Sequence, residues 1–531
     1  MAASGSLRRA QRLWTICGLD SYYTSEGWGV GQGYPSRAAW ATLAKHLLTG
    51  AALCLCIDGA AACRRPKLKP NVVLVTFDTT RADHISHLGY KRSTTPNLDF
   101  IAKEGVTYTR AYSTSSWTAP SHASIFTSLM PSQHGCHAML GQDVDKINPI
   151  RPNVTMLAQL LGEAGFATAG FVGAPYVSST FGFARGFDVY DDQWEGSHRV
   201  SREVNEKAFA WLNHEATEPF FLFLHYYDPH APYDPDPKLS YPFGSSAQGD
   251  EMRYRTFSPG QYKMEKKDLP TDENFVATII DLYDQEIYAE DHSLGKLVVK
   301  LREIGAWDRT LLIVTSDHGE DFGDRIHRNV QLFDKQISRD EVLWEHGNTP
   351  YHSQCHVPLV IRLPAGKLRG AVVDSVVSNA DIFTTVTSYL QIPPPSGVAG
   401  EDLLSHAAHG PSPRDTMAMA ERYLPDWYAA TLWKGNVELL ELTSTFVGTG
   451  VAIENLPSSP PVLPAPPPGA APPNARPSET ETLSQMRAAL DVYRLRRGGI
   501  SIDLPQRSPP DDWAVQQEEL RKKLKALGYG K

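Results

Sequence analysis

The stretch that decides the fold is NVVLVTFD at residues 71–78. It is a continuous apolar run that ends in an acid, as expected of a strand buried on both faces of a sheet. Further apolar strands are predicted at 106–112, 167–173, 220–226, 310–317 and 358–364. Helical patterns separate them at 95–105, 154–165, 200–217, 274–304 and 378–390. This alternation predicts an α/β fold, in which helices cover both faces of a mostly parallel central sheet.

Acidic and imidazole side chains stand at the ends of three of these strands. Asp78 closes the first strand, and the adjacent pair Asp317 and His318 closes the strand at 310–317. His225 lies near the end of the strand at 220–226. Ligands of such sheets bind beyond the carboxyl ends of the strands. Each acid alone is more simply explained as a helix or turn cap.

Two further elements add histidines and an acid. HYYDPHAPY, at 225–233, contains Asp228 and His230, and a separate Glu-His-Gly element contains His346. Carboxylate oxygen and imidazole nitrogen are suitable ligands for Zn or another divalent ion. Because several of these elements meet at one edge of the predicted sheet, together they predict a metal site.

Thr118 precedes Ala-Pro at the start of a helix predicted at about 119–129. Proline is well tolerated in a first helical turn, so Thr118 can simply cap this helix. A hydroxyl there also lies in the positive field of the helix N-terminus, which favours anions and an alkoxide. Both readings of Thr118 stay open on local sequence alone.

Composition excludes some classes of protein. The chain has 531 residues, of which 41% are hydrophobic and 21% charged, so most of it is not intrinsically disordered. The formal net charge of −9 argues against nucleic acid as the main partner, because phosphate backbones need a basic face. Six cysteines, four of them within the first 63 residues, do not form a disulfide scaffold, although a bridge between Cys136 and Cys355 stays open.

The two ends of the chain differ from its body. Residues 45–63 read KHLLTGAALCLCIDGAAAC, which is too short for a membrane span and typical of a secretory signal. We expect 1–63 to be a leader, with Cys63 as a lipid acceptor of an exported, periplasmic or membrane-anchored protein; a disordered extension is the alternative. A catalytic domain is expected at 70–404 and a smaller C-terminal α+β subdomain at 405–531. The latter contains a proline-rich loop at 457–477 and an amphipathic helix at 511–529.

Several motifs occur together in an order that resembles a known family. They are NVVLVTFDTTRADH, TTPNLDFIAKEGVTYTRAYS, WTAPSHASIFTSLMPSQHG, HYYDPHAPY, YDQEIYAEDHSLGKL, VTSDHGED and VPLVIRLP. Together they are similar to the sulfatase-like branch of the alkaline phosphatase superfamily, from about residue 70 to 400. The family resemblance implies a metal-centred site for a tetrahedral sulfuryl or phosphoryl group, holding one or two divalent ions such as Zn, Mn or Ca.

The resemblance also implies roles for individual residues. Asp78, Asp317 and His318 match the ligands of the ion that binds the nucleophile, Thr118. His230 matches a histidine that contacts the ester or a second metal, and His346 matches a ligand of a second ion. His225 and Asp228, on the same element as His230, are weaker candidates for the second ion, and His225 is also a candidate substrate contact. Two residues complete the expected site: Arg81 either pairs with the anionic group or has a structural role, and Ser121 either fixes the helix start or contacts the ester oxygens. The segment at 325–344 is expected to be an insertion, either near the mouth of the site or as a plain surface loop.

The chain departs from the sulfatase pattern at the nucleophile. Sulfatases have Cys or Ser at the head of a C/S-x-P-S-R motif, which is oxidised to formylglycine, whereas here the motif runs from Thr118 to His122. Oxidation of threonine would give a ketone, so no formylglycine is expected. Threonine at this position resembles the phosphodiesterases and phosphotransferases of the superfamily, where it is the direct nucleophile.

These observations predict a metal-dependent hydrolase in which Thr118 attacks a phosphate or sulfate ester, with phosphodiester chemistry favoured. The expected substrate is an anionic small molecule, or an ester of a glycan or lipid. Three rivals remain: a sulfatase that uses unmodified Thr118, a phosphoryl transferase, and a metal-binding relative without catalysis.

Overall fold

The computed structural model describes residues 69–137, 147–196, 198–243, 273–322, 331–332, 335–336, 344–347, 350–409, 418–424, 427–434, 437–444, 448–455 and 486. The predicted leader with Cys63, the proline-rich loop and the helix at 511–529 lie outside the described residues, and these expectations stay predictions. Most of the insertion at 325–344 also lies outside them.

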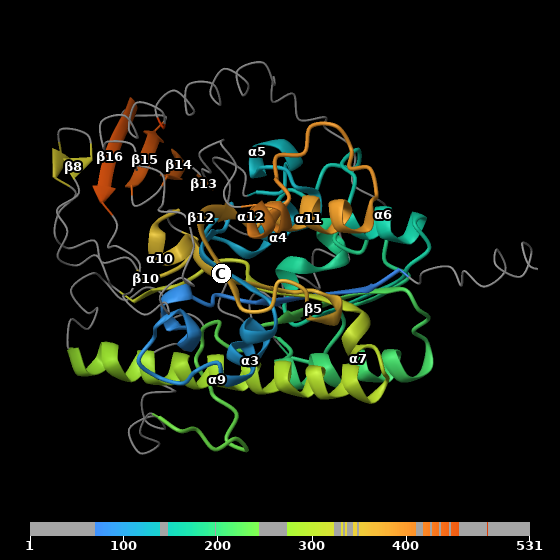
Figure 1. Cartoon of the computed structure of the whole chain (residues 1–531). Helices are drawn as coiled ribbons and strands as arrows, with labels where there is room; N and C mark the ends of the chain where they lie inside the picture. Colours follow the sequence, from blue (N-terminus) through green and yellow to red (C-terminus); the bar gives the residue numbers. More distant parts are fainter. Residues whose placement is uncertain are drawn as a thin grey trace, which may run out of the picture. The chain divides into compact units, whose positions relative to one another are not determined.

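An eight-stranded sheet forms the centre of the described structure (Figure 1). In spatial order its strands are β12 (Ala371–Ser378), β2 (Val106–Tyr112), β11 (His356–Arg362), β6 (Thr310–Ser316), β1 (Asn71–Phe77), β5 (Phe220–Tyr226), β3 (Ala167–Val172) and β4 (Val189–Asp191). Neighbouring strands are parallel except at β11, which runs antiparallel to both β2 and β6. The predicted mostly parallel sheet is confirmed.

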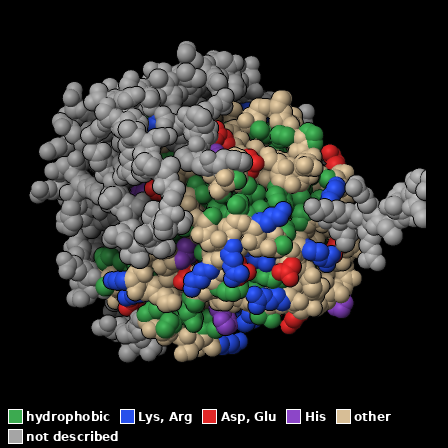
Figure 2. Space-filling model, in the orientation of Figure 1, with side chains coloured by type: hydrophobic (Ala, Val, Ile, Leu, Met, Phe, Trp, Pro, Cys, Tyr) green, Lys and Arg blue, Asp and Glu red, His purple; other side chains and the backbone are tan. Residues whose placement is uncertain are grey.

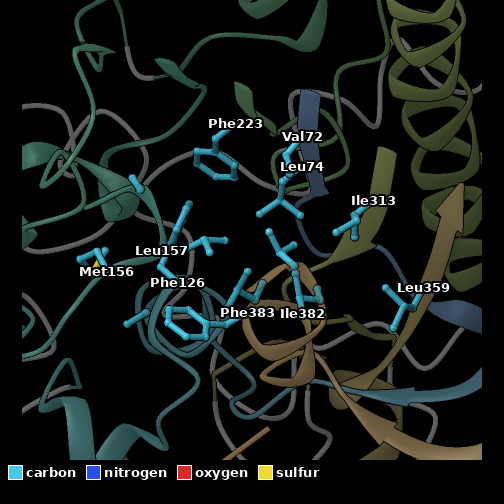
Figure 3. Close-up of a cluster of buried hydrophobic side chains, with 14 of the residues drawn as sticks. Val72, Leu74, Phe126, Met156, Leu157, Phe223, Ile313, Leu359, Ile382 and Phe383 are labelled. Carbon is cyan, nitrogen blue, oxygen red and sulfur yellow. The ribbon is translucent and has the colours of Figure 1, made fainter. Parts of the chain in front are cut away.

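The apolar run of β1 explains its central place, because all seven of its residues are buried. Successive side chains point to opposite faces, so Val72 and Leu74 join one hydrophobic core and Val73 and Val75 join the other. Figure 3 shows Val72 and Leu74 in the first core, on the same side of the sheet as Phe126. The sheet is therefore packed on both faces.

Helices cover the two faces, as the alternating pattern predicts (Figure 1). The first core is covered by α4 (Thr118–Thr127), α6 (Leu157–Glu163), α11 (Asp381–Leu390) and α12 (Leu403–His409). The second core is covered by α3 (Pro96–Glu104), α7 (Ser201–His214) and the long α9 (Glu273–Glu303). Two short helices, α5 (Pro131–His134) and α10 (His352–Cys355), lie in connections.

The carboxyl ends of β1, β5 and β6 lie at one edge of the sheet, because these neighbours are parallel. The segment from β2 leads at this edge into α4. Because β11 runs the opposite way, it begins there, and the residues that precede it reach the same edge. This topology brings the Asp, His and Thr elements of the sequence together.

A smaller antiparallel sheet follows the main one in the chain. It consists of β13 (Ala418–Leu424), β14 (Trp427–Lys434), β15 (Val437–Ser444) and β16 (Gly448–Asn455). Trp433 stacks on Tyr112 at the end of β2, with ring centroids 4.4 Å apart. The Glu421 backbone N–H donates to the Thr114 carbonyl at 2.8 Å, in the segment that leads to α4. The small sheet thus supports the approach to Thr118.

Two two-stranded pairs lie around the insertion: β7 (Asp321–Phe322) with β10 (Trp344–Glu345), and β8 (Gln331–Leu332) with β9 (Lys335–Gln336). Among the described residues, no helix combines the length and the apolar character needed to cross a membrane. Cys136 and Cys355 are both buried and are not bonded to each other, so the disulfide that the sequence left open is not formed.

Candidate active site

Three of the predicted metal ligands meet at the carboxyl edge of the central strands. Asp78 follows β1, and Asp317 and His318 follow β6, its hydrogen-bonded neighbour. All three side chains are fully buried. Their ligand atoms lie within 4.8 Å of one another, which is a spacing that one metal ion can bridge.

Each carboxylate has one oxygen held by hydrogen bonds and one oxygen that makes no hydrogen bond. Asp317 Oδ1 accepts the backbone N–H groups of His318 at 2.8 Å and Thr79 at 3.3 Å. Asp78 Oδ2 lies 2.9 Å from Nε2 of His225. The other oxygens, Asp317 Oδ2 and Asp78 Oδ1, are buried and make no hydrogen bond. Both lie near His318 Nε2, at 3.4 and 3.7 Å respectively.

This donor set fits a divalent cation. Burying two carboxylate oxygens without a partner is costly unless a proton or cation compensates them. Burial raises the pKa of both carboxyls, and Glu320 raises that of Asp78 further while Asp78 raises that of Asp317. Burial also lowers the pKa of His318, so its imidazole is neutral and can act as a ligand. Asp78, Asp317 and His318 are therefore the residues that would hold the ion.

Thr118 is the first residue of α4, and its side chain is fully buried beside this group. The preceding Trp117 is the N-cap, and no side-chain hydrogen bond caps the helix. Thr118 Oγ1 lies 3.1 Å from His318 Nε2. Since His318 Nδ1 lies 2.9 Å from the Gly319 carbonyl, which can only accept, Nε2 accepts and the Thr118 hydroxyl donates. The hydroxyl therefore faces the metal ligands rather than capping the helix.

Ser121 and His122 fix the start of α4. Ser121 Oγ donates to the Asp317 carbonyl at 2.6 Å, which ties the helix to the end of β6. His122, which was not among the predicted site residues, has Nδ1 2.9 Å from the Thr118 carbonyl and Nε2 2.9 Å from Thr76 Oγ1. Burial lowers the pKa of His122, so a neutral ring stands where the sulfatase motif has arginine.

His346 lies against His318, and His230 lies against His346, so the three predicted histidines are brought together. Ring centroids are 4.4 Å apart for His318 and His346 and 4.8 Å apart for His230 and His346. Burial, and then His346, lowers the pKa of His230. Glu320, which was missed although the quoted VTSDHGED motif contains it, lies 3.3 Å from His346 Nδ1, and burial raises its pKa to about 8. The roles of these residues stay predictions.

Two other predicted residues contact different partners. Asp228 accepts the Ser201 backbone N–H at 2.7 Å and the Ser201 hydroxyl at 2.9 Å, which places its carboxylate at the start of α7. Among the described residues, two groups of side chains have the spacing of metal ligands, and Asp228 belongs to neither of them. The Arg81 guanidinium binds the Asp83 carboxylate and donates to the Glu320 carbonyl.

The loop after β1 is anchored by α9, which sequence reasoning also missed. The Tyr283 hydroxyl accepts the Arg81 backbone N–H at 2.9 Å and donates to the Thr79 carbonyl at 2.7 Å. The Thr80 hydroxyl donates to Glu290 at 2.8 Å. Helical periodicity indicates α9, but it carries no signal that polar groups on its buried face hold a loop. These contacts fix the backbone that presents Asp78.

The surface differs from this interior. Figure 2 shows charged side chains of both signs exposed on one face of the molecule, whereas the carboxylates of Asp78 and Asp317 are fully buried. An anionic substrate can therefore bind near these carboxylates only if a buried cation or proton compensates their negative charge.

Comparison with known proteins identifies relatives of the whole catalytic region. The family model described as Sulfatase matches residues 70–392. The multifunctional alkaline phosphatase superfamily protein PehA of Trinickia caryophylli is 27% identical over 424 residues, covering 64% of this chain and 78% of that protein.

Two solved structures share the fold. The phosphonate monoester hydrolase of Agrobacterium radiobacter has a TM-score of 0.54 at 18% identity, covering 86% of this chain and 96% of that one. A protein solved in complex with its substrate D-glucosamine-2-N,6-O-disulfate has a TM-score of 0.54 at 17% identity, covering 72% of this chain and 91% of that one. At such identities the likeness shows the fold alone.

Proposed function

Because the chain belongs to the sulfatase family and is a sulfatase-like ester hydrolase of the alkaline phosphatase superfamily, we propose that it cleaves phosphate or sulfate esters with Thr118 as its nucleophile. Within this class we favour phosphodiester and related phosphoryl substrates. The substrate is an anionic small molecule, or an ester of a glycan or lipid. The leader-like sequence at 45–63 supports the further proposal that the protein is exported, with lipid attachment at Cys63.

The observation that carries this proposal is the position of the Thr118 hydroxyl. It lies at the N-terminus of α4, 3.1 Å from His318 Nε2, beside the two carboxylates that each have an unpartnered oxygen. A helix N-terminus stabilises negative charge, so an alkoxide at Thr118 is favoured there. No other threonine of the quoted motifs combines these features.

The sulfatase family is metal-dependent, and the ligand set described above fits a divalent ion. When bound, such an ion lowers the pKa of the Thr118 hydroxyl and compensates the charge of the ester. Its identity as Zn, Mn or Ca stays open. The protein fixes the nucleophile itself, since Ser121 and His122 hold the first turn of α4 through Asp317 and Thr118 carbonyls.

The reaction then has two displacements. Thr118 Oγ1 loses its proton to solvent and attacks phosphorus or sulfur, and the bond to the leaving oxygen breaks, so that oxygen takes a proton from water. Water next attacks the Thr118 ester and regenerates the hydroxyl. In this second displacement we assign His230 the role of proton relay: it takes the proton of the attacking water and passes it to the Thr118 oxygen as the ester bond breaks.

The phosphoryl preference rests on the residue type at the nucleophile position. Threonine cannot be oxidised to the aldehyde that a formylglycine sulfatase uses, because its β-carbon bears a methyl group. A direct alkoxide nucleophile suits phosphoryl transfer, where catalysis is mostly positioning and charge neutralisation. A second ion at His346 and His230 would add to this neutralisation, and it belongs to the same proposal. A sulfatase that works through unmodified Thr118 is the second candidate, favoured by the family match itself.

The test compares Thr118→Ala with Thr127→Ala. Thr127 is equally buried on the same helix, but its hydroxyl donates only to the Ala123 carbonyl, at 2.6 Å. We expect Thr118→Ala to lose at least about 10³-fold in kcat while Thr127→Ala stays near wild type. Activity is measured on aryl phosphodiester, phosphonate, phosphomonoester and sulfate esters, together with ions per chain.

The outcomes separate the parts of the proposal. Full activity of Thr118→Ala would rule out Thr118 as the nucleophile. Fewer than one ion per chain in the active protein would rule out the metal site. If sulfate esters were the fastest substrates, the sulfatase alternative would replace the phosphoryl preference.

A further inference from the structure

A histidine that neither cleavage step uses lies directly behind Asp78. We propose that His225 is a positioning residue, whose Nε2–H holds one oxygen of Asp78 so that the other oxygen points to the ion. This inference rests on the metal site of the proposed function. It assigns to His225 a role different from the substrate contact that the sequence predicted.

The carboxylate of Asp78 is held on one side only. His225 Nε2 lies 2.9 Å from Oδ2, whereas Oδ1 has no hydrogen-bond partner and lies 3.7 Å from His318 Nε2. Asp317 shows the same arrangement, with backbone N–H groups on Oδ1 and an unpartnered Oδ2. The His225 imidazole therefore holds one oxygen of Asp78, just as backbone N–H groups hold one oxygen of Asp317.

The backbone around His225 leaves it little freedom. His225 pairs with Thr76 of β1 and with Val172 of β3, so it lies inside the sheet, on the strand beside Asp78. The Asp78 N–H donates to the Tyr226 carbonyl at 2.9 Å, which links the two strands at this point. Because His225 is fully buried between two paired strands, its ring direction is fixed by the fold.

The proton positions favour this role over a second metal site. His122, His225 and Asp317 also have metal-ligand spacing. However, His122 Nδ1 must carry the proton, since it lies 2.9 Å from the Thr118 carbonyl, which can only accept. His122 Nε2 then accepts from the Thr76 hydroxyl at 2.9 Å. The His122 atom that lies 3.4 Å from Asp317 Oδ2 is this protonated Nδ1, so His122, unlike His318, presents no lone pair to that carboxylate.

The protons of His225 give the same answer. A neutral imidazole has one N–H, and Asp78 Oδ2 can use it only at Nε2. Nδ1 then keeps a buried lone pair without a partner. If Nε2 bound an ion instead, Nδ1–H would be a buried donor without an acceptor. Donation to Asp78 retains a charge-assisted hydrogen bond and is the arrangement with the smaller penalty.

The experiment measures Mn²⁺ and Zn²⁺ dissociation constants of the full chain by competition with a chelating dye, with ions per chain at saturation. Residues that orient a metal ligand typically contribute 10- to 100-fold in metal affinity, so we expect His225→Leu to bind the ion roughly 10- to 100-fold more weakly at unchanged stoichiometry. His225→Gln should recover most of this loss, because its amide N–H can also donate to Asp78.

The matched control is His134→Gln. His134 is also fully buried, but it contacts Ser124 Oγ and the Cys136 N–H, away from the ligands, so its variant should keep the wild-type dissociation constant. Melting temperatures with excess chelator show whether each variant folds. If His225→Leu does not fold, the metal affinity of His225→Gln tests the inference in its place.

Three results would overturn the inference. Wild-type affinity in His225→Leu would show that Asp78 needs no such support. Loss of a whole ion from His225→Leu would make His225 a ligand instead. If the wild-type protein bound no ion, both this inference and the proposed function would fail, whereas the first two results leave the proposed function standing.

Discussion

Replacement of Tyr283 by phenylalanine tests how strongly α9 holds the loop that presents Asp78. The variant removes one buried oxygen that makes two hydrogen bonds, from the Arg81 N–H at 2.9 Å and to the Thr79 carbonyl at 2.7 Å. A buried polar group deprived of its partner costs about 1–3 kcal/mol, so losing two partnerships should lower the free energy of unfolding by about 2–6 kcal/mol. The ring itself remains and packing is kept.

The measurement is urea unfolding with excess chelator, so that bound ions do not contribute to stability. Tyr226→Phe is the control, because the Tyr226 hydroxyl is also buried but donates a single hydrogen bond, to Asn205 at 2.6 Å. We also expect Tyr283→Phe to bind the ion more weakly, since the same loop presents the Thr79 N–H to Asp317. A loss of stability no larger than that of Tyr226→Phe would refute this reasoning.

Ion binding should strengthen as pH rises. Burial holds the pKa of the Asp78 and Asp317 carboxyls above the usual range, so ion binding displaces protons, and affinity should rise about tenfold per pH unit for each proton displaced until both are ionised. Dissociation constants that do not change between about pH 5 and about pH 9 would contradict this. Asp228→Asn should cost about 1 kcal/mol in urea unfolding, because Asp228 accepts the Ser201 N–H at the start of α7, but should leave ions per chain unchanged. Loss of an ion by elemental analysis would instead identify Asp228 as a ligand.

Much of the fold could be predicted because an unbroken run of hydrophobic residues indicates a strand in the interior of a sheet. The unbroken apolar run at 71–78 predicts a strand with two buried faces, and β1 indeed lies between β5 and β6 with every residue buried. Strand direction has no such signal. The segment at 358–364 was correctly predicted as a strand, yet its pattern does not show that β11 runs antiparallel to its neighbours. The edge strand β12 was missed, and it carries the exposed Val372.

The site was predictable to the level of which elements meet, but not of where each side chain points. Asp78, Asp317 and Thr118 follow from the rule on strand ends and from the helix start. Asp228 lies just past the end of β5, where the chain turns, and only the structure shows that its carboxylate meets Ser201. His122 lies one helical turn after Thr118, so its ring reaches the Thr118 carbonyl. In the sequence, His122 is noticeable only because it stands where the sulfatase motif has an arginine.

The antiparallel pair of β7 and β10 has a consequence for how this chain can change over time. Its strands end at Phe322 and begin at Trp344, so the two ends of the intervening segment are hydrogen-bonded neighbours. The entropy of closing a loop grows only slowly with its length, so residues can be added or removed between these ends at small cost. His346, directly after β10, keeps its place while that segment varies. Selection can therefore change the length of this segment without displacing the histidine that follows it.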